Sequence, residues 1–425
     1  MDFLEFLNGA VTPYHTVDCL KRAFAMSGFR AVDRPGRQDG TFMGESFFFE
    51  RSGALIAVRV PQKIDDSTRF RIALSHTDFP ALKVAPHPDK ACAGCRTIHS
   101  EIYGSPLFTS WLDRDLGYAG LLAFERDGKI GSRLVRGDKL FRIPQLAIHL
   151  NRGVNQDGLK VNPQTDLDAL WSSAAPGGNK TTGQNFVEAL QGELSDGERL
   201  LDFDVQLFDA QPASVGGFND EWIYSGRLDN LSSCHAIAEG LLSAGSLEKD
   251  FAVAAFMNNE EVGSVTREGA GGNFLRSVLE QVWEGAGQPL SSLASSLSSS
   301  LALSIDMAHA EHPNFPQKHE ANHAPILGEG VVLKTNSQKR YASDVMSSAR
   351  FKLLCEKAKV PYQTFITRND MPCGSTVGPS VSASLGIPTV DIGEPMLSMH
   401  SIREMIAVKD HQDMIALAKS LYTEG

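Results

Sequence analysis

Histidine and carboxylate side chains stand at or just past the ends of several segments that read as buried strands. In an open α/β sheet such positions gather at one edge, where ligands bind. Taken singly, each carboxylate is more often a helix N-cap or a solvated loop residue, but together these residues form a set that can hold divalent metal ions. The set consists of His76, Asp78, Asp229, Glu260, Glu261, Asp306 and His400.

The composition of this set predicts hydrolytic chemistry. Imidazole and carboxylate ligands suit zinc, and manganese or cobalt are also possible. Two ions explain the number of ligands better than one, and a pair of ions about 3.5–4 Å apart acidifies a shared water and stabilises an oxyanion. The adjacent carboxylates Glu260 and Glu261 add a further element, because one can bind a metal while its neighbour acts as a base on the water.

The elements that must position these residues alternate between apolar strands and helices in the first and last parts of the chain. Continuous apolar runs at 251–257, 301–305 and 388–392 predict strands covered on both faces. Between about 81 and 222 the pattern changes to short β-like runs separated by glycine, aspartate and asparagine. We therefore predict an α/β domain of residues 1–85 and 223–425, interrupted by a β-rich domain of residues 86–222.

Helical spacing of apolar residues predicts helices in the segments around the strands. These segments are 3–28 with a break near Pro13, 231–245, 273–284, the first part of 290–304, 343–359 and 409–423, with a short helix at 185–194. The polar stretch at 172–180 predicts a loop.

Composition and charge exclude several classes of partner. The 425 residues carry 40 Lys and Arg against 51 Asp and Glu, and a net charge of -11 opposes binding to nucleic acid or to an anionic membrane. No run of about 18 apolar residues occurs, so no transmembrane helix is expected. Six cysteines are too few for a disulfide scaffold, which favours a reduced, cytoplasmic setting. Cys92 and Cys95 have the spacing of a redox or zinc pair, but without a second such pair they are interpreted as ordinary thiols.

Together, these motifs resemble the aspartyl aminopeptidase family of co-catalytic zinc exopeptidases. The resemblance covers nearly the whole chain, in the expected order, and it implies a central mixed sheet flanked by helices with an inserted β-rich dimerisation domain. The segments that carry it are 75–78, 226–230, 258–264, 304–310, 334–341, 374–379 and 399–404, together with 111–116 and 142–150 in the insert.

The resemblance implies which residues hold the metals. His76, Asp229 and Asp306 would hold one zinc ion. Asp229, Glu261 and His400 would hold the other, so that Asp229 bridges the two.

The resemblance also implies the roles of the remaining residues. Glu260 would be the general base, which passes a proton from the bridging water to the leaving amine, and Asp78 would orient the His76 ring. Family members remove an N-terminal Asp or Glu from peptides. Lys334 and Tyr341 match the family's substrate-binding pair, with Lys334 supplying a cation, and His309 matches a further pocket residue.

In the insert, His149 resembles a histidine that the family presents to a neighbouring subunit's active site, which implies that catalysis depends on a dimer. Family members also assemble into dodecamers built from dimers. One departure is Gln145, where some members carry a histidine.

Two alternatives stay open. The same metal set would serve a broader-specificity aminopeptidase or an amide deacylase. A non-catalytic assembly protein of this fold is the alternative from a different class. The presence of Glu260 beside a complete ligand set argues against it, because no structural role requires a base beside a metal ligand.

Overall fold

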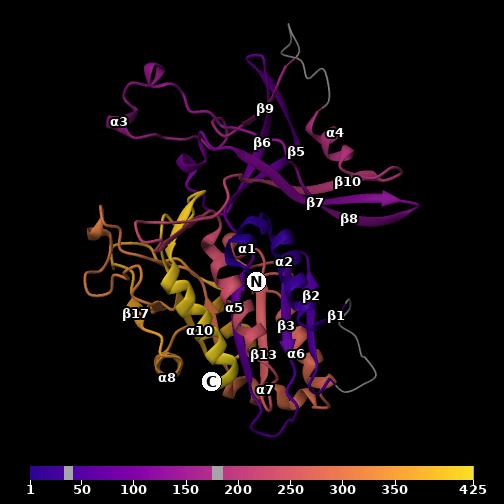
Figure 1. The fold of residues 1–425 in the computed structure, drawn as a ribbon, viewed down its shortest axis with the longest axis vertical. Coiled ribbons are helices and arrows are strands. Elements are labelled where there is room, and N and C mark those ends of the chain that lie inside the picture. Colours follow the sequence, from indigo (N-terminus) through magenta and orange to yellow (C-terminus); the bar gives the residue numbers. More distant parts are fainter. Residues whose placement is uncertain (33–41, 175–184, 425) are drawn as a thin grey trace. The chain divides into compact units, whose positions relative to one another are not determined.

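The computed structural model describes residues 1–32, 42–174 and 185–424 and divides into two compact units (Figure 1). The first unit contains Met1–Asp78, Ala213–Met399 and Glu404–Gly425, and the second contains Phe79–Pro212 with the short stretch His400–Arg403. These boundaries differ from the predicted ones at 85/86 and 222/223. The difference arises because strand β5 (Ala81–Cys92) already belongs to the sheet of the second unit, whereas β11 (Ser214–Gly216) pairs within the first.

A nine-stranded mixed sheet forms the centre of the first unit, in the order β1-β2-β3-β13-β4-β14-β18-β16-β17. Strands β13, β4, β14 and β18 run parallel, while β3 and β16 flank them in the antiparallel direction. The bounds are β1 Arg30–Val32, β2 Ser46–Arg51, β3 Ala54–Arg59, β4 Phe70–His76, β13 Phe251–Met257, β14 Leu301–Ile305, β16 Val331–Lys334, β17 Tyr362–Phe365 and β18 Thr389–Gly393. The predicted α/β class with a mixed sheet is thereby confirmed.

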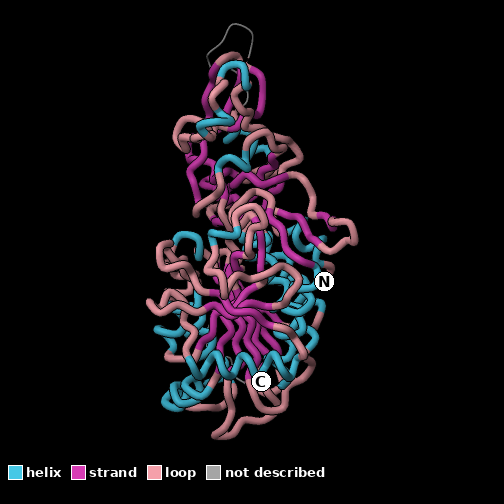
Figure 2. Tube along the Cα trace, turned by 90° about the vertical axis from the view of Figure 1, so that its left-hand side faces the viewer, coloured by secondary structure: helices cyan, strands magenta, loops and turns pink. Residues whose placement is uncertain are grey.

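Helices cover both faces of this sheet, and Figure 2 shows the strands as a twisted fan between them. Apolar residues at every second position of β4 and β13 share one core cluster with α6, α7 and α9. The opposite face of β4 contacts α5, where Ser75 Oγ lies 3.3 Å from Cys234 Sγ. The helices are α1 Phe3–Gly9, α2 Pro13–Met26, α5 Leu228–Ser243, α6 Phe274–Gly285, α7 Leu290–Ser299, α8 Val345–Ala358, α9 Val377–Leu385 and α10 Val408–Glu424. All the helices predicted for this unit are confirmed within a few residues.

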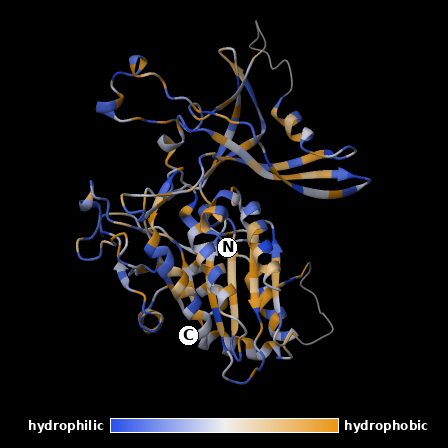
Figure 3. Ribbon diagram, in the orientation of Figure 1, coloured by the Kyte–Doolittle hydropathy of each residue, from blue (hydrophilic) through white to orange (hydrophobic). Residues whose placement is uncertain are grey.

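The strands of the central sheet are apolar along most of their length (Figure 3). Every residue of β13 and of β14 is buried. Burial on both faces is the reason that these strands appear in the sequence as continuous apolar runs rather than as alternating ones. A smaller five-stranded sheet completes the first unit, in the order β11-β12-β20-β19-β15, with β12 Trp222–Ser225, β15 Ala308–His309, β19 Pro395–Leu397 and β20 Glu404–Ala407.

The second unit is built on a six-stranded antiparallel sheet in the order β8-β7-β10-β5-β6-β9. Its core packs Tyr118, Phe141 and Phe186 edge to face against one another. Beside β5, the elements are β6 Cys95–Tyr103, β7 Leu116–Arg126, β8 Lys129–Arg136, α3 Val154–Asp157, β9 Ala169–Ser173, α4 Phe186–Gly192 and β10 Arg199–Asp209.

Two sequence predictions in this unit have structural outcomes. Cys92 and Cys95 are the paired end residues of the β5–β6 hairpin, and both are free thiols. Ala93 and Gly94 between them have φ of 52° and 74°, so the spacing is that of a two-residue hairpin turn. Of the predicted loop at 172–180, Ser172 and Ser173 belong to β9, and residues 175–180 lie outside the described part of the chain.

Among the described residues, no helix is both long and apolar enough to cross a membrane.

Candidate metal centre

Several of the predicted ligands lie at the edge of the central sheet where the parallel strands end. His76 is the last residue of β4 and pairs with Met257 at the end of β13, and Asp306 follows β14 directly. Glu261 lies in the short 3₁₀ turn η3 (Glu260–Val262), just beyond β13. Asp229 comes from the first residues of α5, where the backbone departs from helical dihedral angles. The sheet topology thus brings together residues that lie far apart in the sequence.

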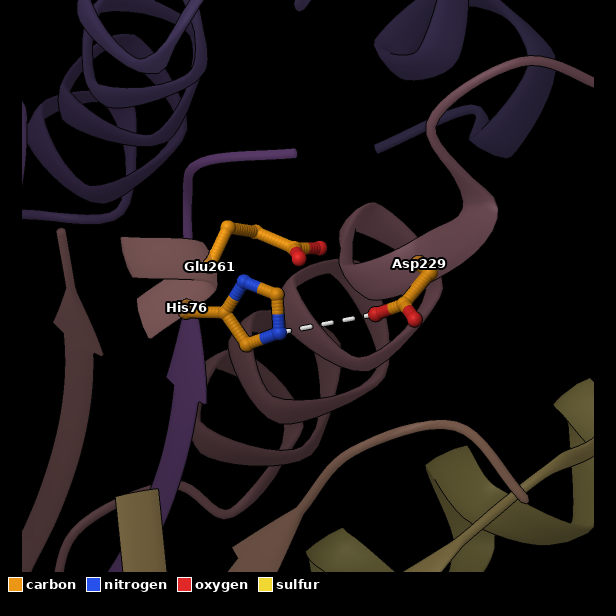
Figure 4. Close-up of side chains that lie close together, drawn as sticks. All are labelled: His76, Asp229 and Glu261. Atoms are coloured by element: carbon orange, nitrogen blue, oxygen red, sulfur yellow. Dashed lines mark ion pairs between the residues drawn. The ribbon is translucent and has the colours of Figure 1, made fainter. Parts of the chain in front are cut away.

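His76, Asp229 and Glu261 form a group that can hold a metal ion. One ligand atom from each lies within 4.8 Å of the others, and Figure 4 shows the three side chains pointing toward one another. His76 Nε2 is 3.4 Å from Asp229 Oδ1 and 3.6 Å from Asp306 Oδ1. These separations exceed those of good hydrogen bonds, but two ligand atoms about 2.0–2.2 Å from a tetrahedral ion are separated by about this much.

The hydrogen bond on the other side of the His76 ring determines which nitrogen faces the carboxylates. Nδ1 lies 2.9 Å from the backbone carbonyl oxygen of Asp78, and a carbonyl can only accept, so Nδ1 donates. The lone pair of Nε2 then faces two carboxylates that are themselves acceptors. Nε2 is buried without a hydrogen-bond partner among the described residues. Acceptors that face one another in a buried site require a cation between them, so these residues fit a metal ion.

The charges of the site support the same conclusion. Complete burial lowers the pKa of His76, but the nearby carboxylates of Asp229, Asp306 and Asp78 raise it well above its usual value. The carboxylates therefore favour a positive charge on this ring. His76 and Asp78 are completely buried and Asp229 is 4% exposed, so solvent does little to screen the negative charge.

Asp78 positions the turn that carries the two adjacent glutamates. Its Oδ1 accepts the backbone N–H of Glu260 at 3.1 Å, and its Oδ2 accepts that of Glu261 at 3.0 Å. The short contact to His76 comes from the carbonyl of Asp78, whereas its carboxylate lies 3.5 Å from Nδ1. Asp78 therefore acts on both sides of the centre, through its main chain on the histidine and through its side chain on the turn.

The environment of Glu260 suits a proton-transfer group. Burial, together with the charges of Asp306, Asp78 and Asp229, raises the pKa of Glu260 to about 8, although the charge of His76 opposes this increase. A carboxyl group with a pKa near neutrality both accepts and returns a proton readily.

Lys334 places a buried cation beside the metal ligands. It is the last residue of β16 and is only 3% exposed, and its Nζ lies 3.9 Å from Asp306 Oδ2 and 5.5 Å from the centre of the Tyr341 ring. Burial raises the pKa of Tyr341, so its hydroxyl stays protonated. A cavity of about 260 Å³ has both Tyr341 and His309 in its lining. The structure thus brings together three of the predicted substrate-binding residues, Lys334, Tyr341 and His309.

Comparisons with known proteins identify the family. A family model described as aminopeptidase I zinc metalloprotease (M18) matches residues 6–422. The chain belongs to the M18 family of zinc aminopeptidases. It is accordingly a hydrolase, a metallo-aminopeptidase, and the resemblance to the aspartyl aminopeptidase family is confirmed.

Individual M18 relatives match over nearly the full chain. The chain is 43% identical to a probable M18 family aminopeptidase 2 of Streptomyces avermitilis, covering 100% of this chain and 97% of the relative. It is 36% identical to aspartyl aminopeptidase 4 of Saccharomyces cerevisiae, covering 99% and 94% respectively. The solved dodecamer of mApe1 from S. cerevisiae superposes with a TM-score of 0.85 at 26% identity, covering 99% of this chain and 95% of that one.

Two predicted site residues of this M18 protein, His400 and His149, belong to the second unit. His400 Nδ1 donates to the carbonyl oxygen of Ser105 at 3.1 Å, which leaves Nε2 as the acceptor nitrogen of the ring, as in His76. His149 is exposed in the 3₁₀ turn η2 (Ile148–Leu150). Gln145, the departure from the family pattern, donates hydrogen bonds from both its main chain and its side chain to the Asp113 carboxylate.

Sequence reasoning did not single out two buried carboxylates that support this M18 centre. Glu404, 2% exposed, accepts the backbone N–H of Asp229 at 3.1 Å. Asp391 is fully buried and accepts from Thr376 Oγ1 and from the main chain of Ala342, next to Tyr341, both at 2.6 Å. A signal for Asp391 was present, since an aspartate within the apolar run 388–392 must have partners inside the fold.

Proposed function

We propose that this M18 protein removes unblocked N-terminal Asp or Glu residues from peptides with two zinc ions per subunit. The observation that carries the acidic specificity is the buried ammonium group of Lys334, which lies beside the proposed ligand Asp306 and over the ring of Tyr341, and Tyr341 lines a cavity of about 260 Å³. The ion pair of this ammonium group with Asp306 is long, at 3.9 Å, and the carboxylate of a substrate side chain would supply a second negative partner.

The proposed ligand set follows the expectations from the sequence. His76, Asp229 and Asp306 would hold one ion, and Asp229, Glu261 and His400 the other. When bound, two zinc ions polarise the substrate carbonyl and lower the pKa of water. Manganese or cobalt would suit the same ligands.

The protein's own residues would then direct the reaction. Glu260 Oε takes a proton from the attacking water and returns it to the nitrogen of the leaving amine. Asp78 holds the main chain of Glu260 and Glu261, so that the base and the adjacent ligand keep their relative positions. Lys334 pairs with the substrate carboxylate, while Tyr341 and His309 line the pocket and offer hydrogen-bond donors.

We also propose that the protein works as a homodimer and assembles further into a dodecamer. The solved M18 relative named as a dodecamer supports higher assembly. His149 is flanked by exposed apolar side chains, with Leu146, Ile148 and Leu150 at 62%, 47% and 74% exposure, a composition that favours burial against another subunit. His149 would then reach the active site of the partner subunit. The cytoplasmic location expected from the cysteines stays a prediction.

The test is a panel of chromogenic amides that differ only in the N-terminal residue, assayed with and without a chelator. We expect Asp and Glu amides to be cleaved far faster than Ala, Leu and Lys amides, and we expect the chelator to abolish cleavage until zinc is restored. Cleavage of neutral and acidic amides at similar rates would favour a broader aminopeptidase. Cleavage of N-acylated substrates instead would favour a deacylase.

Absence of both zinc binding and hydrolysis would contradict a catalytic role and favour a non-catalytic assembly protein. Zinc content measured on the purified protein separates this outcome from a mere lack of the right substrate.

A further inference from the structure

A second cavity lies at the opposite end of the strands that carry the metal ligands. Its volume is about 160 Å³, and its lining includes Phe70 and Leu301 at the amino ends of β4 and β14 and Asp250 just before β13. Leu354 of α8 and Leu421 of α10 complete an apolar floor, and both are buried. A dry apolar cavity of about 150 Å³ is large enough to bind benzene in another protein, so this one can take a six-carbon group.

The rim of this cavity is strongly basic. Four cationic side chains, Arg69, Arg71, Arg350 and Lys357, line it with the single carboxylate of Asp250, which leaves a net lining charge of three positive units (four minus one). This excess stands out in a chain whose net charge is -11.

The carboxylate of Asp250 is already paired with one of these arginines. Asp250 accepts from Arg71 Nε at 2.8 Å and lies 2.7 Å from Arg71 Nη2, and Arg71 Nη1 donates to the carbonyl of Leu421. Arg71 is therefore a structural element of the wall. Of the remaining cations, Lys357 also interacts within the protein, which leaves Arg69 and Arg350.

Arg69 and Arg350 are the groups with capacity for a ligand. The Arg69 side chain is exposed and has no hydrogen-bond or ion-pair partner among the described residues. Arg350 Nη1 donates to the carbonyl of Ser300 at 2.7 Å, which fixes the guanidinium at the rim. Burial lowers the pKa of Arg350, and the charge of Arg69 lowers it further, so the two cations lie close enough to repel each other. An anion between them would remove this repulsion.

We propose that this cavity binds a small organic anion, with its carboxylate or phosphate head on Arg69 and Arg350 and an apolar body of about six carbon atoms in the pocket below. The site lies at the other end of the strands from the metal centre. It is independent of the proposed peptidase specificity, and no residue of the metal centre lines it.

The probes are benzoate and phenyl phosphate, with benzamide as the uncharged analogue of the same shape, titrated into the zinc-loaded protein at constant ionic strength by calorimetry. We expect saturable binding of at least one of the two anions and none of benzamide. The tighter of the two anions identifies the head group.

Two variants change exposed residues of the lining and leave its buried apolar floor intact. Arg69→Ala removes an exposed guanidinium at the rim, and Leu353→Glu adds a negative charge at a lining position that is 57% exposed. We expect Arg69→Ala to weaken anion binding by about tenfold or more, the loss typical of a charge-assisted hydrogen bond, and Leu353→Glu to weaken it by repelling the anion. Arg199→Ala, at an exposed arginine of β10 with a 3.5 Å ion pair to Glu125, is the matched control and should bind as the unmodified protein does.

Carboxylates and phosphates also bind zinc, so the comparison with Arg69→Ala and Leu353→Glu is decisive. Binding that is unchanged in both variants places the anion elsewhere and overturns the proposal. Absence of saturable binding by both probes overturns it as well. Cleavage of the acidic amides should be unaffected by Arg69→Ala, which keeps this test separate from that of the peptidase activity.

Discussion

The two ends of the central sheet carry opposite charge, and they differ in how far that charge is exposed to solvent. At the carboxyl ends of β4, β13 and β14 the side chains include several buried carboxylates, with Asp78 completely inaccessible and Asp306 only 7% exposed. At the amino ends of the same strands they are basic, and the rim residue Arg69 is exposed. A buried excess of one charge requires a resident counter-ion, whereas an exposed excess is hydrated by water and binds a counter-ion only weakly. The same sheet thus predicts a tightly bound metal at one end and an exchangeable anion at the other.

The largest expected effect comes from removing the proposed base at the acidic end. Glu260→Gln should lower kcat by about 10²–10⁴-fold, because proton transfer by a positioned side chain contributes this much, while zinc content and melting temperature stay close to normal. The matched control is Glu280→Gln on α6, whose carboxylate is 38% exposed. Normal turnover in zinc-loaded Glu260→Gln would show that the acidic end has another base.

The next effect concerns the cation buried at the acidic end. Lys334→Ala should reduce the preference for Asp over Ala substrates by about 10–100-fold, the range expected for a lost charge-assisted hydrogen bond. The ratio of kcat/KM for the two amides measures it. Zinc content should change little, since Lys334 is not a ligand. If both amides lose activity equally, Lys334 neutralises the ligands instead of selecting the substrate.

An effect of similar size is expected from the residue that joins His76 to the glutamate turn. The two carboxylate oxygens of Asp78 accept the backbone N–H groups of Glu260 and Glu261. Asp78→Asn replaces one of these oxygens with an amide NH₂, which can only donate and therefore loses one of the two hydrogen bonds. Loss of such a partner behind metal ligands costs about 10–100-fold in metal affinity or activity. Zinc titration with a competing chelator, together with kcat/KM, checks this. Asp89→Asn in the second unit, where one oxygen accepts a backbone N–H from Phe186, serves as the control.

The smallest expected effect is on the stability of the first unit, and it comes from the buried carboxyl group of Asp410. Burial, together with the charge of Glu394, raises the pKa of Asp410 to about 7, although the hydrogen bonds from Gly328 and Gly330 oppose the increase. A raised folded-state pKa means that the folded protein binds the extra proton between about pH 4 and pH 7, so this contribution to stability is lost as the pH rises through that range.

Asp410→Asn removes the titration. The melting temperature of this variant minus that of the unmodified protein should therefore increase from pH 5 to pH 8, by a few degrees. Differential scanning fluorimetry of the two zinc-loaded proteins measures the difference. A difference that is constant or decreases with pH would show that Asp410 is ionised throughout, held by its two backbone donors.

Much of the first unit can be predicted from the sequence because its strands are buried on both faces. The apolar runs at 251–257 and 301–305 have the same bounds as β13 and β14, since double-sided burial leaves a continuous apolar signature. Apolar spacing predicts the helices, and Pro13 begins α2 at the predicted break. In the second unit, the long strand β5 includes Pro86, His87 and Pro88, and its sequence does not predict a strand, because a strand with a register shift carries no regular alternation.

The sequence by itself determined the chemical types at the centre and their order along the chain. Strand ends are readable, and neighbouring parallel strands end at the same edge of a sheet. The motifs alone therefore place His76, Asp306 and the glutamate pair at one edge. The protein's family membership follows from the same motifs.

Only the tertiary structure decided which atoms face one another. The donor role of His76 Nδ1, the two hydrogen bonds of Asp78 to the glutamate turn, and the support of Asp229 by Glu404 all depend on contacts between separate segments of the chain. The basic cavity likewise joins Arg69 to Arg350 and Leu421, residues with no shared motif. Spacing along the chain constrains neighbours on one element, whereas the distance between elements is set by packing, which no local pattern records.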